Sequence, residues 1–338
     1  MIITRTPYRI SFFGGGTDYP AWYEKNGGAV LSTSIDKYCH ITARSLPPFF
    51  EKRHHIVYSR IENIDHLDEI EHPSVRECLR FSGIDHGVSI IHDGDLPARS
   101  GVGSSSAFTV GLLHALYALR GKMVSRYQLA KDAIHVEQEC IKENVGSQDQ
   151  SAAAFGGLNR ITFGGSEKIR VEPIVMNKIR LNDFQDHLML FFTGTSRNAS
   201  EVAADWIKNA ERNENDLRKM HKMVDEAVNI LTDATADLRE FGKLLDDSWK
   251  LKRGLTENVS NSVVDQAYDS AKEAGAIGGK LLGAGGGGFM MFFVDPDKKE
   301  AVKRNLQGYM HVPFRFENLG SHVVHYSQNI EVAGTGVV

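Results

Sequence analysis

Three glycine-rich stretches and one acidic turn contain the residue types that bind phosphate and polyhydroxylated molecules. The middle stretch, Pro97 to Ser106, places two glycines directly before three serines and an apolar helical pattern. Glycines in a tight turn free backbone N–H groups, and the first N–H groups of a helix point outward at the positive end of its dipole. The pattern predicts a phosphate site, although a Gly-Ser loop with an ordinary serine cap fits it equally well. The candidate phosphate-binding residues are Gly101, Val102, Gly103, Ser104, Ser105 and Ser106.

The first glycine stretch follows a β-rich segment and leads into a hydroxyl and a carboxylate. Gly14, Gly15 and Gly16 directly precede Thr17 and Asp18. A hydroxyl and a carboxylate beside exposed backbone offer the donors and acceptors that several sugar hydroxyls require. Polyol binding and a plain turn, with Asp18 as the N-cap of the next helix, have comparable weight on these residues alone.

The last stretch has five glycines in six residues, from Gly283 to Gly288. It satisfies G-x-G-x-x-G literally. A dinucleotide site, however, needs a strand before the glycines and a helix after them, and here the order is reversed. Because so many glycines carry a large ordering entropy, close approach of the backbone to a ligand explains them better than a flexible hairpin does.

An acidic turn at residues 146–150 contains Asp149, which follows a helical segment that includes Glu137. With a cation nearby, such an aspartate stays ionised and can accept a proton from a hydroxyl. Taken singly, each carboxylate is better explained as a solvated helical side chain. The sequence contains no zinc-type Cys or His spacing, no Walker loop and no nucleophile elbow.

The composition excludes several classes of protein. The chain has 338 residues, of which 41% are hydrophobic and 24% charged, as is typical of about two globular domains. A formal net charge of −4 disfavours extended contact with nucleic acid or an anionic membrane, and no apolar run is long enough to span a bilayer. Three cysteines and an N-terminus without an apolar leader favour a reducing compartment. We therefore expect a cytoplasmic monomer or homodimer whose partner is a small molecule.

The elements that position the motifs follow from hydrophobic periodicity. The pattern predicts strands at 2–5, 29–44, 88–92, 156–163, 187–194, 289–294 and 322–327. It predicts helices at 105–119, at 126–142 with Ser125 as N-cap, over most of 198–274, and at 297–307. This order indicates a mixed α+β protein with two lobes. We place the lobes at 1–185 and 186–330, divided at the turn-prone residues 181–186, and expect a flexible tail at 331–338.

In this order, the motifs between residues 7 and 289 resemble those of the GHMP small-molecule kinases, which include galactokinase and mevalonate kinase. The resemblance covers nearly the whole chain. It implies an N-terminal lobe like ribosomal protein S5 domain 2, a ferredoxin-like C-terminal lobe, and ATP in the cleft. Within the family, TPYRISFFGGGTDYPAWY, VGSQDQSAAAFGGLN and FFTGTSRNA are similar to bacterial D-glycero-D-manno-heptose 7-phosphate kinases. Galactokinases carry Glu-His where this chain has Gly15-Gly16, which argues against galactose.

The resemblance implies roles for the motif residues at the reacting centre. Asp149 would take or orient the proton of the sugar hydroxyl, and Arg9 would lie near it and the γ-phosphate. Residues Gly101 to Ser106 would wrap the phosphates of ATP. Ser105 and Glu137 would be ligands of Mg²⁺.

For the acceptor, the resemblance implies that Thr17 and Asp18, with Gly16 beside them, hold sugar hydroxyls. Gly285, Gly286 and Gly287 would stabilise the region of Asp149 and the substrate pocket, and Arg197 is a candidate for a distal phosphate on the sugar. The implied function is ATP- and Mg²⁺-dependent phosphorylation of an anomeric hydroxyl, with D-glycero-D-manno-heptose 7-phosphate as the first candidate acceptor. A kinase of another sugar, such as L-fucose, and a non-catalytic sensor that kept the fold are the alternatives.

Overall fold

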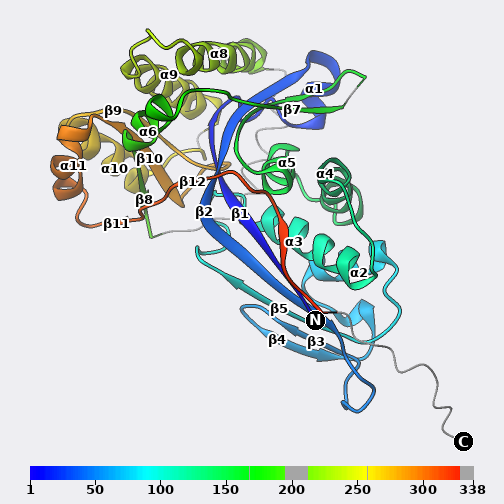
Figure 1. Ribbon diagram of the computed structural model, residues 1–338. Helices are drawn as coiled ribbons and strands as arrows, with labels where there is room; N and C mark the ends of the chain where they lie inside the picture. Colours follow the sequence, from blue (N-terminus) through cyan, green and yellow to red (C-terminus); the bar gives the residue numbers. More distant parts are fainter. Residues whose placement is uncertain (167, 195–211, 257, 328–338) are drawn as a thin grey trace, which may run out of the picture.

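The computed structural model describes residues 1–166, 168–194, 212–256 and 258–327, and these form two lobes of mixed helix and sheet (Figure 1). The two-lobed α+β architecture expected from the element order is therefore confirmed. Arg197 and the tail 331–338 lie outside the described residues. No helix in the described ranges is both long and apolar enough to cross a bilayer.

The first lobe is built on a nine-stranded sheet in which two long strands run side by side. Strands β1 (Ile2–Phe13) and β2 (Gly28–Ser45) pair antiparallel. The sheet continues in the order β13-β1-β2-β5-β3-β4, and β2 also pairs with β6 and β12. The remaining strands are β3 (His54–Val57), β4 (Ile61–Ile64), β5 (Val88–Gly94), β6 (Leu158–Phe163), β7 (Ile169–Pro173), β12 (Phe316–Glu317) and β13 (His322–Tyr326).

One buried helix packs on a face of this sheet and contacts other helices of the lobe. Helix α3 (Ser104–Leu119) packs against β1 and β2, and its small and apolar residues allow it to be buried on nearly every side, as the sequence predicts. Around it lie α2, α4 and α5 (Figure 1). The first-lobe helices other than α3 are α1 (Pro20–Asn26), α2 (Pro73–Ser82), α4 (Arg126–His135) and α5 (Gln148–Phe155).

The second lobe contains a four-stranded antiparallel sheet in the order β11-β8-β10-β9. Strand β10 is buried at every residue, because helices pack on the sheet. The strands are β8 (Leu188–Phe192), β9 (Ala276–Leu281), β10 (Phe289–Val294) and β11 (Met310–His311). The helices are α6 (Lys178–Asp186), α8 (Glu214–Thr232), α9 (Arg239–Leu255), α10 (Ser262–Glu273) and α11 (Lys299–Asn305).

Aromatic side chains join the two lobes. Phe12 of β1, Phe184 of α6 and Phe241 of α9 form a buried cluster with ring centroids 4.7 to 5.6 Å apart. The tilted and edge-to-face geometry is the favourable one for aromatic rings. The cluster holds the C-terminal lobe against the strand that carries the first glycine motif.

The structure corrects three sequence predictions. Residues 181–186, expected to form a turn, lie in α6, because Phe184 fills the junction between the lobes. The helix expected at 126–142 ends at His135 and continues as a π-helical turn, Val136–Cys140, although Ser125 caps its start as predicted. The segment 316–326 returns to the first sheet as β12 and β13, so 186–330 is not a single lobe. Pairing with β13 satisfies the backbone groups along the outer edge of β1.

Candidate active site

One cavity of about 760 Å³ lies where the two lobes meet, and the glycine-rich motifs surround it. The first lobe contributes residues of β1, the loop before α3 and the turn before α5. The second lobe contributes residues of α9, the end of β9 and the loop that follows it. The cavity is therefore completed only by both halves of the chain.

The loop before α3 has the geometry expected of an anion site. Gly103 takes a left-handed conformation with φ of 73°, and α3 begins at the next residue. The hydroxyl of Ser104 accepts the backbone N–H of Arg99 at 3.1 Å, which closes the loop on itself. Gly101, Gly103 and the three serines line the cavity, whereas the Val102 side chain is buried and its carbonyl accepts the Arg9 N–H at 3.0 Å. The positive end of α3 thus faces the cavity, as predicted.

The last glycine stretch supports this loop by close backbone contact. A Cβ atom on Gly101 would come within 2.5 Å of the Leu282 carbonyl oxygen, and one on Gly283 within 2.5 Å of the Gly101 Cα. Any side chain would separate the two loops. Gly283 lines the cavity, but Gly285, Gly286 and Gly287 do not, and Gly285 packs on Val259 instead. These three glycines therefore make no direct wall of the cavity, and their role in stabilising the Asp149 region and the substrate pocket stays a prediction.

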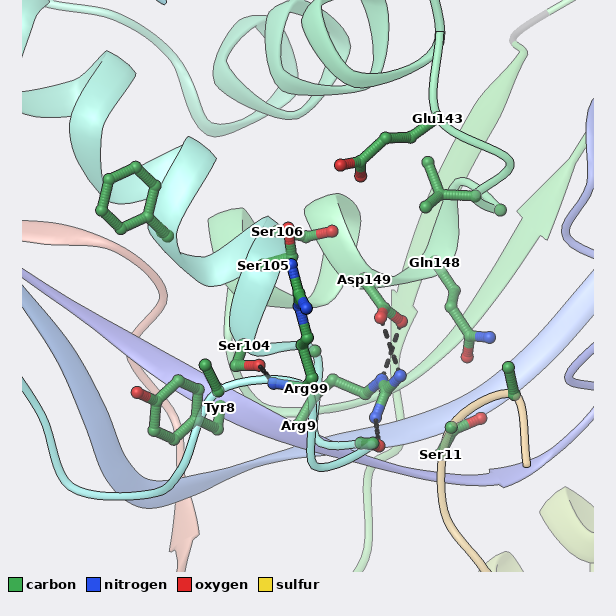
Figure 2. A pocket seen from close by; sticks show the side chains of 18 of the residues that line it. Tyr8, Arg9, Ser11, Arg99, Ser104, Ser105, Ser106, Glu143, Gln148 and Asp149 are labelled. Carbon is green, nitrogen blue, oxygen red and sulfur yellow. Dashed lines mark hydrogen bonds and ion pairs between the residues drawn. The ribbon is translucent and has the colours of Figure 1, made fainter. Parts of the chain in front are cut away.

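Arg9 and Asp149 form a two-pronged ion pair beside the loop (Figure 2). Arg9 Nε donates to Asp149 Oδ1 at 2.8 Å, and Nη2 donates to Oδ2 at 2.7 Å. The third nitrogen, Nη1, donates to the Gly101 carbonyl at 2.6 Å. Arg9 is buried, while the Asp149 side chain keeps 25% of its surface exposed. The pair fixes the carboxylate at the start of α5, next to the phosphate loop, with lone pairs left for a further donor.

Asp18 also lies in the cavity wall, and it is almost fully buried. Its Oδ1 accepts the N–H of Gly16 at 2.8 Å. Burial raises the pKa of Asp18 to about 6, and the charge of Asp149 adds to that rise, against the lowering effect of neighbouring backbone N–H groups. The absence of a side chain at Gly146 makes this arrangement possible, because a Cβ there would come within 1.9 Å of Asp18 Oδ2.

Thr17 forms hydrogen bonds with the backbone of the glycine turn and does not line the cavity. Its Oγ1 lies 2.9 Å from the carbonyl oxygens of Gly14 and Ala29 and accepts the Ala29 N–H at 3.1 Å. It is fully buried and does not line the cavity. The predicted contact between Thr17 and a sugar hydroxyl does not fit this geometry, because the hydroxyl is already used by the backbone.

The predicted Mg²⁺ ligands are Ser105 and Glu137, and the structure joins Glu137 to the next serine, Ser106. Glu137 is fully buried in the π-helical turn, and its Oε2 accepts hydrogen bonds from the Ser106 hydroxyl at 2.8 Å and from Gln150. Burial raises the pKa of Glu137 to about 7. Ser105 also lines the cavity but makes no hydrogen bond to Glu137. A buried carboxylate beside cavity hydroxyls suits Mg²⁺, so Glu137 could hold the ion together with Ser106 or with Ser105.

The sequence interpretation missed several residues that line the cavity. Lys252 and Lys280 reach it from the second lobe, and Ser11 and Gln148 reach it from the first (Figure 2 shows the latter two). Lys252 sits in an amphipathic helical pattern, where lysine is normally a solvated residue. Lys280 offers the better signal, because a lysine in an apolar strand directly before a glycine loop is seldom solvated.

Comparison with known proteins gives two family matches. The profile for the N-terminal domain of GHMP kinases matches residues 71–157, and that for the C-terminal domain of GHMP kinases matches residues 230–312. The first match contains the phosphate loop and Asp149. The second contains Lys252, Lys280 and the last glycine stretch.

Curated relatives match over most of the chain. A D-glycero-alpha-D-manno-heptose 7-phosphate kinase of Campylobacter jejuni is 31% identical over 91% of this chain and 95% of its own length. A galactokinase of Pyrococcus furiosus is 27% identical over 89% of this chain and 91% of its own.

Solved structures share the fold. A D-glycero-D-manno-heptose 1-phosphate kinase of Bacteroides thetaiotaomicron superposes with a TM-score of 0.79 at 24% identity, covering 97% of this chain and all of that one. A phosphomevalonate kinase of Streptococcus pneumoniae, solved with phosphomevalonate and AMPPNP, gives a TM-score of 0.74 at 16% identity and covers 94% of this chain and all of that one. The fold expected from the motif resemblance is thereby confirmed.

Proposed function

The chain belongs to the GHMP kinase family, and we propose that it transfers the γ-phosphate of ATP to the anomeric hydroxyl of a sugar phosphate. The first candidate acceptor is D-glycero-D-manno-heptose 7-phosphate, which would become the 1,7-bisphosphate. The observation that supports this most strongly is the Arg9–Asp149 ion pair, set beside the start of α3 in one cavity. A carboxylate and a helix N-terminus are thus brought close together from segments about 140 residues apart in the chain.

The reaction is a displacement at phosphorus. The acceptor oxygen forms a bond to the γ-phosphorus, the bond from that phosphorus to the β–γ bridging oxygen breaks, and ADP leaves. Asp149 accepts the hydrogen bond of the attacking hydroxyl and either takes its proton or orients it. Arg9 holds this carboxylate in place, because two of its nitrogens donate to the two carboxylate oxygens. Phosphoryl transfer depends mainly on such positioning and charge stabilisation.

ATP, the phosphate donor, would occupy the end of the cavity that is lined by the loop before α3. Its phosphates would accept N–H groups from Gly101 to Ser106 and the start of α3. Its base would lie near His72 and Phe108, which stack with centroids 4.6 Å apart and line the cavity. Mg²⁺ held by Ser106 and Glu137 would neutralise phosphate charge.

A coupled ADP assay over a panel of sugars and sugar phosphates tests this proposal. The panel holds heptose 7-phosphate, free heptose, L-fucose and galactose, with ³¹P NMR of the product to locate the new ester. We expect the highest kcat/KM with heptose 7-phosphate and a new phosphate at C1. This second readout matters because one relative is named for a 7-phosphate substrate and one structural neighbour as a 1-phosphate kinase.

The panel also separates the alternatives. Preference for L-fucose would replace the acceptor and keep the reaction, and a bifunctional fucokinase of Arabidopsis thaliana is 24% identical over 89% of this chain. ATP binding without ADP formation on any acceptor would favour a sensor and would contradict the proposal.

A further inference from the structure

Two lysines, the buried Lys280 and the half-buried Lys252, line the end of the cavity that lies next to the first glycine motif. We call this end the acceptor chamber and define it by Ser11, Asp18, Gln148, Lys252 and Lys280. The first three come from the N-terminal lobe and the two lysines from the C-terminal lobe. In Figure 2, Ser11 and Gln148 lie on one side of the Arg9–Asp149 pair, and Ser104 to Ser106 lie on the other. Ser11 and Gln148 therefore lie across the ion pair from the serines of the phosphate loop.

Lys280 is only 4% exposed, at the end of β9. Its Nζ donates to the Phe12 carbonyl at 2.8 Å, which leaves two of its three N–H groups unused. No carboxylate in the described ranges lies within ion-pair distance of it. Burial lowers the pKa of Lys280 well below its ordinary value, and the charges of Lys252 and Arg9 add to this effect.

Lys252, in the last turn of α9, is half-buried and also has no carboxylate partner among the described residues. Its Nζ donates to the carbonyls of Leu281 and Gly283, and it forms no ion pair with any residue that the structure describes. Burial lowers the pKa of Lys252 to about 7; Arg9 lowers it further and Asp18 raises it. A buried ammonium group without a counter-ion is unfavourable, so the two lysines together lack an anion.

We infer that Lys252 and Lys280 form an anion subsite for the phosphate that the acceptor already carries, so that the enzyme selects a sugar phosphate over the free sugar. The inference rests on the proposed function and names the residues that recognise this group. Ser11 Oγ and Gln148 Oε1 are buried in the same chamber without a hydrogen-bond partner, as expected where a polar ligand supplies the partners.

The charge balance of the cavity favours a phosphate dianion at this place. The charge of Arg9 is already matched by Asp149, and three of its five N–H groups are used by Asp149 and the Gly101 carbonyl. The γ-phosphate of ATP is the other source of a phosphate, but the loop of Gly101 to Ser106 already offers it N–H groups. A dianion beside two ammonium groups restores local neutrality.

Kinetics with matched acceptors test the inference. Lys280→Met and Lys252→Met keep side-chain length and remove the charge, and Lys243→Met is the control, because Lys243 lies on the same helix α9 and is 62% exposed. Each enzyme is assayed with heptose 7-phosphate and with free heptose. We expect the two cavity variants to lower kcat/KM for the phosphorylated acceptor roughly 10- to 100-fold. We expect changes below about threefold for free heptose, for the KM of ATP, and for every parameter of the control.

The outcomes separate the two sources of phosphate. Equal losses of kcat/KM on both acceptors would overturn the inference, and so would an equal rise in the KM of ATP. A rise in the KM of ATP would assign the lysines to ATP binding. Equal losses with a lower melting temperature would assign them to the stability of the fold. If no acceptor is turned over by wild type, the proposed function fails. Calorimetric titration of heptose 7-phosphate into wild type and Lys280→Met then decides the subsite, because unchanged affinity would overturn it and a tenfold loss would support it.

Discussion

The two ends of the cavity are built in different ways. The donor end consists of backbone N–H groups and small hydroxyls from one short stretch of chain, Gly101 to Ser106, at the start of α3. The acceptor chamber consists of buried and half-buried polar and charged side chains that come from both lobes. Backbone recognises any nucleoside triphosphate, whereas side chains can differ between relatives with different acceptors. Under the proposed function, this contrast predicts that acceptor specificity resides in the chamber.

The largest expected effect on catalysis comes from Asp149, which lies between the two ends of the cavity. Asp149→Asn should lower kcat by roughly 10²–10⁴, because the amide cannot accept the proton and loses its charge-assisted bonds to Arg9. The affinity for ATP should change by less than about threefold, as measured by titration. Glu139→Gln, at an exposed position nearby in sequence, is the control. Turnover close to wild type in Asp149→Asn would remove this residue from the mechanism.

The next prediction concerns the donor end alone. Ser106→Ala should raise the Mg²⁺ concentration needed for half-maximal rate by about tenfold, because Ser106 is the hydroxyl bonded to Glu137. Ser105→Ala should have a smaller effect on the same titration, and neither variant should alter the KM of the acceptor. A larger Mg²⁺ effect for Ser105→Ala would restore the original pair of Ser105 and Glu137.

The third prediction concerns the acceptor chamber alone. The pKa of Asp18 is about 6 in the folded protein and ordinarily 3.8, so its favourable contribution is complete below 3.8 and is lost as the pH rises through 6. Between about pH 5 and pH 7.5 we expect it to cost roughly 1–1.5 kcal/mol of unfolding free energy. Asp18→Asn should lack this part of the pH dependence in urea titrations at several pH values. Parallel curves for both proteins would show that Asp18 is not the group responsible.

The smallest effect should come from Thr17, which lies beside the chamber but faces away from it. Thr17→Val removes the acceptor of the Ala29 N–H and should cost about 1 kcal/mol of unfolding free energy, with the KM of the acceptor within about twofold. Urea titration and steady-state kinetics measure the two quantities. A large rise in the KM of the acceptor with unchanged stability would show that Thr17 binds the sugar. Thr17 would then have to be included in the acceptor chamber.

The same contrast explains what could be predicted from sequence. The candidate phosphate loop is one contiguous pattern, so local rules point to it, and the buried helix that follows was also predicted. The pairing of Arg9 with Asp149 came only from the family resemblance, because no local rule joins residues so far apart. Lys252 and Lys280 were missed because burial depends on packing between lobes. The hydrogen bond of Ser106 to Glu137 could not be predicted from helical spacing, because Glu137 lies in a π-helical turn.

The return of the chain to its first sheet affects how the protein can be divided. Strands β12 and β13 lie near the C-terminus, yet they pair with β2 and β1. The C-terminal lobe is in this sense an insertion into a discontinuous N-terminal domain. A fragment that stops before residue 316 would leave the outer side of β1 as an unpaired edge, open to pairing with another molecule. A soluble N-terminal fragment should therefore join residues 1–185 to the last two strands through a short linker.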